Sequence, residues 1–300
     1  MTRYLFITGP NRSGTTWVGN MLDSHHEIAV LGEAAIFRTI SDTASPESWL
    51  DADAFEHWRT TSTTATFFGD ISRSDLEAAA RRGMVEAIIK QRWNPKPTAR
   101  VLGDRTPYHT AANIEAVHRL FPDAVVVPLC RDGRDVVVSS AYKQLAQRNL
   151  GLHFGTLDEA EARYRAHIEG DPGIEIPLLT PDFVRFIAKR WSEATRGGER
   201  ASQLFGSRCI TLSYESLLEN AADYLANLFR VLGVSQPEAS AHRATEAHSF
   251  RAVTGRDRGD ADPTSLARSG IAGAWQEHFD DGLLQAFRDA AEREPDDLPM

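Results

Sequence analysis

A glycine-bounded loop near the start of the chain constrains the fold more than any other feature. The apolar run 4–7 leads directly into Gly9-Pro-Asn-Arg-Ser-Gly-Thr-Thr-Trp17, which predicts a strand, a tight loop and then a helix. Backbone N–H groups in such a loop, and the N-terminus of the helix, bind phosphate. Gly9 and Gly14 have the Walker A spacing, but Thr15 stands where the ATPase lysine would be, and Arg12 supplies a cation two residues before Gly14. The loop therefore predicts a phosphate-bearing ligand other than ATP–Mg²⁺.

The remainder of the chain alternates short apolar runs with helical stretches. Strands are expected near 4–7, 28–31, 101–102, 124–130 and 209–212, and helices near 15–23, 111–120, 136–147, 183–195 and 221–232. Residues 149–181 show weak periodicity and are interpreted as a mobile connection. Alternating strands and helices predict an α/β fold, with a P-loop-like parallel sheet of about five strands and helices on both faces. Ligands bind beyond the carboxyl ends of such strands, so the turns at Gly9, Gly103 and Arg131 should meet at one edge.

Composition excludes several classes of function. The net charge of −9 argues against nucleic acid or an acidic membrane surface as a partner. No apolar run approaches the roughly 20 residues that span a bilayer, and the first strand leaves no room for a signal peptide. The two cysteines are expected in the core, and no histidine (His25, His26, His109 and His153 are scattered) has metal-ligand spacing with a partner. We therefore expect a cytoplasmic protein without a metal site.

Two motifs carry a family resemblance. The segment Arg12-Ser13-Gly14-Thr15-Thr16-Trp17 resembles the 5′-phosphosulfate loop of the sulfotransferases, which transfer a sulfuryl group from 3′-phosphoadenosine 5′-phosphosulfate (PAPS). The segment 131–135, Arg-Asp-Gly-Arg-Asp, followed by Ser139, is similar to the family's 3′-phosphate site, in which the first arginine and a serine eight residues later hold the phosphate. Arg131 would end a strand and Ser139 would lie about two turns into a helix, so a dianion between them meets a forked guanidinium and a hydroxyl.

Further motifs follow in the family's order. Residues 214–217 (Tyr-Glu-Ser-Leu) look like its Tyr-Glu-Asp-Leu segment, and residues 268–275 resemble its closing motif Arg-Lys-Gly-x-x-Gly-Asp-Trp, with serine and alanine replacing the lysine and the aspartate. The resemblance implies that Trp17 and Phe250 sandwich the adenine and that Tyr214 touches its edge. It also implies a 3′-phosphate grip by the closing motif, at Arg268, Ser269 and Gly270.

The acceptor side requires a base. Residues 21–33 are similar to the tyrosylprotein sulfotransferases, in which a Gly-Glu pair supplies the catalytic carboxylate, so Glu33 is the predicted general base. A solvated or helix-capping carboxylate is the alternative. Residues 103–107 (Gly-Asp-Arg-Thr-Pro) resemble the Glu-Lys-Thr-Pro segment of carbohydrate and bacterial sulfotransferases. That resemblance implies that Arg105 faces the phosphosulfate and that Asp104 orients it or assists Glu33, although an internal salt bridge is an equal alternative. His109 is the other candidate base.

These motifs predict one sulfotransferase domain over residues 1–300. Its variable, acceptor-side segments would be about 35–98 and 145–205, and its donor-closing loop about 251–275. The enzyme would use PAPS as co-substrate without a metal and would sulfate a hydroxyl on a small molecule, a carbohydrate or glycolipid, or a tyrosyl or phenol group. Two alternatives remain open. A small-molecule P-loop kinase would need ATP and Mg²⁺, against which the missing lysine argues, and an inactive nucleotide-binding regulator would not need Glu33.

Overall fold

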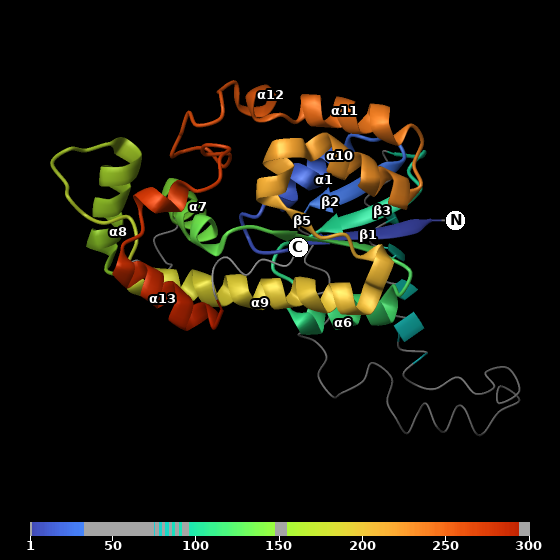
Figure 1. Cartoon of the computed structure of the whole chain (residues 1–300), viewed down its shortest axis with the longest axis horizontal. Helices are drawn as coiled ribbons and strands as arrows, with labels where there is room; N and C mark the ends of the chain where they lie inside the picture. Colours follow the sequence, from blue (N-terminus) through green and yellow to red (C-terminus); the bar gives the residue numbers. More distant parts are fainter. Residues whose placement is uncertain are drawn as a thin grey trace, which may run out of the picture.

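The computed structural model describes residues 2–32, 96–147 and 155–293, together with single helical residues between 75 and 91. Its centre is a five-stranded sheet in which all strands run parallel, in the order β2-β3-β1-β4-β5 (Figure 1). The strands are β1 (Arg3–Thr8), β2 (Ile28–Gly32), β3 (Val101–Arg105), β4 (Val125–Cys130) and β5 (Leu212–Ser213). This architecture confirms the predicted α/β class and the parallel sheet.

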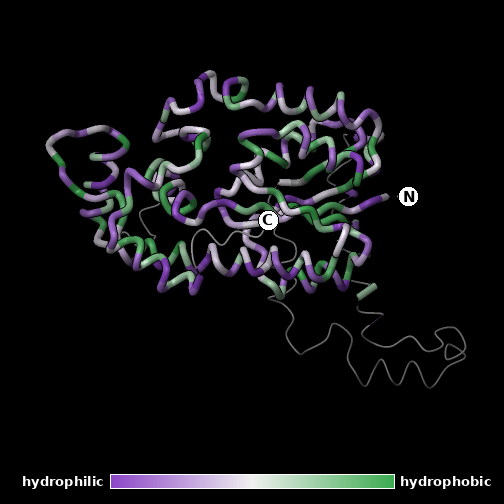
Figure 2. Tube along the Cα trace, in the orientation of Figure 1, coloured by the Kyte–Doolittle hydropathy of each residue, from purple (hydrophilic) through white to green (hydrophobic). Residues whose placement is uncertain are grey.

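The side chains of β1 alternate between the two faces of the sheet, as the period of a strand requires. Leu5 and Ile7 pack in one core, with α1 (Thr15–Asp23), α10 (Tyr214–Leu232) and α11 (Pro237–Ala247). Tyr4 and Phe6 pack in the opposite core, with α6 (Ala111–Leu120) and α9 (Pro181–Phe205). Figure 1 shows these helical layers on either side of the sheet, and Figure 2 shows hydrophobic residues concentrated along the central strands.

A third core lies beside the sheet, where α9 meets α7 (Gly133–Ala146), α8 (Leu157–Tyr164) and α13 (Asp281–Ala291). Trp191 of α9 and Phe287 of α13 are fully buried there, with ring centroids 5.4 Å apart. The indole Nε1 of Trp191 donates to the carbonyl of Arg131 at 2.9 Å. Through this hydrogen bond, the third core holds the residue that directly follows β4.

Several element boundaries differ from the sequence prediction. The α9 helix begins at Pro181, where Thr180 caps it, and continues to Phe205, ten residues beyond the expected end. The α10 helix begins at Tyr214, with a kink at Asn220, and Cys209 makes only an isolated bridge to Val126 instead of starting a strand. Of the segments expected to vary, 35–98 lies largely outside the described residues.

Within the described part of residues 149–181, the structure has regular helix despite the weak periodicity of the sequence. Helix α8 begins there with a capping box, in which Thr156 accepts from the backbone of Glu159 and Glu159 accepts from the backbone of Thr156. A π-helical turn, η1 (Arg165–Glu169), continues it. The Thr-x-x-Glu spacing is the sequence signal that would have predicted this helix.

The carboxyl edge of the sheet is the place where the three predicted turns meet. Because β1 lies between β3 and β4, the loops that follow these strands are neighbours. The N–H of Tyr108 donates to the carbonyl of Gly9 at 2.7 Å, and Arg131 reaches the carbonyl of Arg12. The short helix α12 (Phe250–Thr254) and the segment that follows it lie over the same edge, up to the 3₁₀ turn η3 (Ala274–Glu277). No helix in the described ranges is both long and apolar enough to cross a membrane.

Candidate functional site

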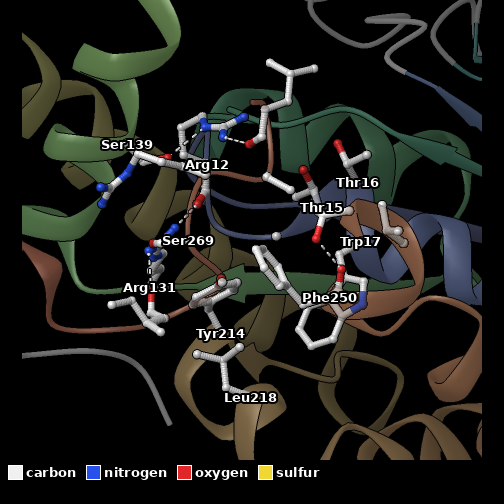
Figure 3. Close-up of a pocket in the computed structure, with 18 of the residues that line it drawn as sticks. Arg12, Thr15, Thr16, Trp17, Arg131, Ser139, Tyr214, Leu218, Phe250 and Ser269 are labelled. Atoms are coloured by element: carbon white, nitrogen blue, oxygen red, sulfur yellow. Dashed lines mark hydrogen bonds between the residues drawn. The ribbon is translucent and has the colours of Figure 1, made fainter. Parts of the chain in front are cut away.

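A cavity of about 340 Å³ opens at the carboxyl ends of β1 and β4. Its volume lies in the range of small-molecule sites, roughly 300–1,000 Å³. Five segments line it: the loop and first turns of α1, Pro107 after β3, the turn into α7 together with that helix up to Lys143, the start of α10, and residues 248–271 (Figure 3). The structure thus brings together, from separate segments, the predicted cofactor-binding residues Arg12, Gly14, Thr15, Thr16, Trp17, Arg131, Ser139, Tyr214, Phe250, Arg268, Ser269 and Gly270.

The glycine-bounded loop places the N-terminus of α1 at the cavity wall. Gly14, with φ 94° and ψ 10°, caps α1 in the left-handed region and makes no side-chain capping bond. A Cβ atom at this position would lie 3.0 Å from Cδ2 of Tyr214, so both conformation and space favour glycine. The helix N-terminus favours an anion at this wall. Ser13 is the one predicted loop residue outside the lining, because its buried hydroxyl donates to the carbonyl of Pro10 at 2.7 Å.

Arg131 lines the cavity but is largely buried, and its guanidinium contacts two backbone carbonyls and one aromatic ring. Its Nη1 donates to the carbonyl of Arg12 at 2.9 Å and its Nη2 to that of Ile271 at 3.3 Å. The guanidinium carbon lies 4.1 Å from the centre of the Tyr214 ring. Within the described part of the chain, the buried Nε of Arg131 has no hydrogen-bond partner. A buried donor of this kind is costly unless a ligand supplies an acceptor.

Arg12 lies on the same side of the cavity (Figure 3). Its Nε donates to the hydroxyl of Ser139 at 3.0 Å and its Nη2 to the carbonyl of Leu266. The backbone of Arg12 has φ 68°, a conformation that is uncommon for a residue with a side chain and is found more often near functional sites. Both arginines therefore donate to the segment that closes the cavity, Arg12 to the carbonyl of Leu266 and Arg131 to that of Ile271, and Arg12 also contacts Ser139.

The cavity is strongly cationic although the chain as a whole is acidic. Five lining residues carry a positive charge, and none of the described lining residues is acidic; the cations are Arg12, Arg131, Lys143, Arg258 and Arg268. A concentration of like charge in a cleft attracts a polyanion. The sequence motifs did not include Lys143 or Arg258. Lys143 stands four residues after Ser139 on α7, a helical spacing that would have revealed it.

Three aromatic side chains that line the cavity, of Trp17, Tyr214 and Phe250, form an aromatic slot that begins next to Arg131 (Figure 3). Trp17 and Tyr214 lie edge to face, with ring centroids 6.2 Å apart, and the indole Nε1 of Trp17 donates to the carbonyl of His248 at 2.8 Å. Phe250 faces Gly270, where a Cβ atom would approach its Cδ2 to 2.5 Å. An aromatic lining of this kind favours a planar aromatic group.

Glu215, beside Tyr214, supports the site from behind. Its carboxylate accepts from the N–H of Asp132 at 3.0 Å and from the hydroxyl of Ser213 at 2.8 Å. Burial, with a smaller effect of the Glu215 charge, raises the pKa of the Cys130 thiol to about 12. The Tyr-Glu pair in the sequence thus combines a cavity-lining ring with a carboxylate that holds the turn after β4.

Of the predicted base and its arginine, only the arginine lies within the described residues. Glu33 lies outside the described residues. Arg105 lies against α1, where its Nη1 donates to the carbonyl of Thr16 at 3.1 Å and to Asn20 at 3.3 Å. Thr16 and Asn20 line the cavity, whereas Arg105 does not. Arg105 therefore contacts the wall of the cavity from outside.

Asp104 and His109 also lie away from the cavity lining. Asp104 is 1% exposed and accepts from the hydroxyl of Thr106 at 2.7 Å, which braces the turn after β3. His109 is equally buried, and its backbone N–H donates to the hydroxyl of Thr8. Neither side chain is placed to receive a proton from a ligand in this cavity. In the described part of the chain, no group of three or more His, Cys, Asp or Glu side chains is arranged to hold a metal ion.

Comparison with known proteins agrees with this geometry. The model of the sulfotransferase family matches residues 5–171, more than half of the chain. The fold is similar to that of mouse sulfotransferase SULT7A1, solved in complex with PAP, with a TM-score of 0.51 and 13% identity over 96% of this chain and 82% of that one. It is equally similar to the sulfotransferase domain from the curacin biosynthetic pathway, with a TM-score of 0.51 and 15% identity over 100% of this chain and 99% of that one. No curated protein matches the sequence.

Proposed function

The chain belongs to the sulfotransferase family, and we propose that its cavity binds PAPS and that the enzyme transfers the sulfuryl group to a hydroxyl acceptor. The observation that carries this proposal is the pairing of a cationic wall with an aromatic slot in one cavity. PAPS has the same two parts. Its ribose carries a planar base, and it also carries a phosphate at the 3′ position and the phosphosulfate at the 5′ position. The buried Nε of Arg131 supports the proposal further, because a phosphate oxygen would supply its acceptor.

Each part of the donor has a proposed contact. Adenine would lie between Trp17 and Phe250, with Tyr214 at its edge. The 5′-phosphosulfate would lie at the amides of Gly14, Thr15 and Thr16, at the N-terminus of α1. The 3′-phosphate would be bound by Arg131, Ser139, Arg268, Ser269 and Gly270. Arg12 would then release Ser139 and turn toward the phosphosulfate.

The proposed reaction is an in-line displacement. The acceptor oxygen forms a bond to sulfur while the bond between sulfur and the 5′-phosphate oxygen breaks, and the electron pair of that bond stays on the phosphate. Arg12 and the first amides of α1 would stabilise this growing negative charge. Glu33 would accept the proton of the acceptor hydroxyl. Arg105, through the carbonyl of Thr16, would hold the first turn of α1 in position.

A thermal-shift experiment separates this function from the kinase alternative. Ligand binding to the folded state raises the Tm by mass action. PAP (3′-phosphoadenosine 5′-phosphate, the product that remains when PAPS has lost its sulfuryl group) should therefore stabilise the protein, and ADP–Mg²⁺ should not. The reverse order would exclude the sulfotransferase and favour a P-loop kinase. Transfer of label from ³⁵S-PAPS to a panel of phenols, sugars and small hydroxylated molecules then identifies the acceptor class. PAP binding without transfer to any of them would favour the inactive regulator.

The base is tested by replacing Glu33 with glutamine. Glu33→Gln should keep its affinity for PAP and lose most of its turnover, since the amide cannot accept the proton. Asp23→Asn is a suitable control. Asp23 is the last residue of α1, outside the cavity lining, and its carboxylate accepts from the backbone N–H of Val30. Turnover near the wild-type rate in Glu33→Gln would remove Glu33 from the mechanism.

A further inference from the structure

A buried carboxylate on α7 holds the end of the closing loop (residues 251–275). Asp135 is 1% exposed. Its Oδ2 accepts from the backbone N–H of Gly273 at 2.7 Å, and its Oδ1 accepts from that of Trp275 at 3.0 Å. Both carboxylate oxygens are thus committed to the same short stretch of the loop. Hydrogen bonds with a charged partner are shorter and stronger than neutral ones.

The same carboxylate neighbours the arginine of the proposed 3′-phosphate site. Oδ2 of Asp135 lies 3.7 Å from Nη2 of Arg131, and that Nη2 donates to the carbonyl of Ile271, two residues before Gly273. Burial raises the pKa of Asp135, whereas the Arg131 charge and the two backbone N–H groups favour its ionised form. Asp135 and Arg131 therefore contact each other and adjacent residues of the closing loop.

The closing loop is itself a folded unit. Arg256 donates to the carbonyls of Ala267 and Arg268, each at 2.7 Å, and so connects the two sides of the loop. At its end, Trp275 packs under Arg134, whose guanidinium carbon lies 3.7 Å from the ring centre. Because these contacts connect the loop internally, its attachment to α7 helps to set the position of the loop residues that line the cavity.

We infer that Asp135 is a positioning residue that docks the closing loop onto α7 and orients Arg131 toward the 3′-phosphate. In this arrangement, ligand binding requires no separate ordering of the loop, so part of the entropic cost of binding is met during folding. The identity of the phosphate rests on the proposed function, whereas the docking of the loop does not.

The test compares Asp135→Asn with Asp132→Asn. The second variant removes a carboxylate from the same turn. The side chain of Asp132, however, binds Arg134, with 2.7 Å between Oδ2 and Nη2, and not the closing loop. An asparagine at 135 offers one acceptor where two N–H groups need one each. Asp135→Asn should therefore raise the Kd and KM for PAP and PAPS about tenfold or more, as expected for a lost charged hydrogen bond, raise the Kd for AMP by a much smaller factor, and leave the KM for the acceptor nearly unchanged. Trypsin should also cut faster after Arg258 and Arg268, and PAP should slow that cleavage.

Two results would overturn the inference. One is equal loss of PAP and AMP affinity in Asp135→Asn, which would reduce Asp135 to a general structural role. The other is cleavage of the loop at the wild-type rate. If the variant does not fold, hydrogen exchange in the wild-type protein decides, because the amides of Gly273 and Trp275 should be protected without ligand, and exchange within the dead time would contradict the docking. If wild-type protein binds PAP no better than AMP, the proposed function fails, while proteolysis and exchange still test the docking.

Discussion

Replacing Arg131 by lysine separates the shape of the guanidinium from its charge. The fork contacts two backbone carbonyls, of Arg12 at 2.9 Å and of Ile271 at 3.3 Å, and lies over the Tyr214 ring. Lysine keeps a positive charge beside Asp135, so the buried carboxylate is not left without a cation. A lysine ammonium, however, acts as a point charge and cannot offer two parallel donors to one phosphate.

The size of the expected effect follows from the lost donor. A hydrogen bond to a charged group contributes about 1.5–3 kcal/mol. Since about 1.4 kcal/mol is a factor of ten in affinity, the Kd for PAP should rise roughly 10- to 150-fold in Arg131→Lys. The stacking on Tyr214 is weakened as well, by about 0.5–2 kcal/mol. That loss affects the protein with and without ligand, so it should lower the Tm without changing the ratio of PAP to AMP affinity.

Isothermal titration with PAP and AMP measures this directly, because AMP lacks only the 3′-phosphate. AMP affinity should stay within about threefold of wild type, whereas PAP affinity falls by the factor given above. Arg131→Ala should lose more PAP affinity and also unfold more easily, since removing one partner of a buried pair costs about 3–5 kcal/mol. Equal losses for both nucleotides in Arg131→Lys, or PAP affinity equal to wild type, would refute the assignment of this arginine to the 3′-phosphate.

Gly270→Ala should weaken PAP and AMP alike, because a Cβ atom there would lie 2.5 Å from Cδ2 of Phe250 and displace the ring from the slot. Gly255→Ala has the same strained φ and nothing within 4 Å, so calorimetry on both variants isolates the ring contact, and equal losses would contradict it. The Cys130 thiol, whose pKa burial raises to about 12, should react with a disulfide reagent at about pH 8 only after unfolding; rapid labelling of native protein mapped to Cys130, and not to the half-buried Cys209, would contradict its burial. Added salt should weaken PAP more steeply than AMP, as screening of the five cavity cations requires, and parallel salt slopes would argue against a cationic 3′-phosphate site.

The sheet and most of the cavity lining could be predicted because their signals are local. A strand buried on both faces, such as β4, is an unbroken apolar run, and its end marks the edge where a ligand binds. The resemblance to the sulfotransferases paired Arg131 with Ser139, and the spacing of about two helical turns explains how both can line one cavity. The same reasoning extends to Lys143, which the family motif does not contain but which stands one helical turn further on.

Other features depend on contacts that no local pattern records. Arg258 reaches the cavity only because Arg256 folds the closing loop back on itself through the carbonyls of Ala267 and Arg268. The family motif assigned Arg12 to the phosphosulfate, yet its side chain lies on Ser139, a partner 127 residues away. Arg105 follows a recognisable motif, but its direction depends on how α1 packs against β3, and it meets the carbonyl of Thr16 instead of the cavity.

The arginines of the motif 131–135 show why only one of them is suited to a ligand. Arg134 is already neutralised, because its Nε and Nη2 both contact the carboxylate of Asp132, at 3.0 and 2.7 Å. A phosphate would have to break that pair. Arg131 instead donates to neutral carbonyls, and the nearest carboxylate, Asp135, is 3.7 Å away and accepts two backbone N–H groups of its own. Replacing a carbonyl by a phosphate dianion converts a neutral acceptor into a charged one, about doubling the strength of the bond. Asp135 thus shares its charge between Arg131 and two backbone N–H groups, and the Nε of Arg131 stays available to an anionic ligand in an acidic protein.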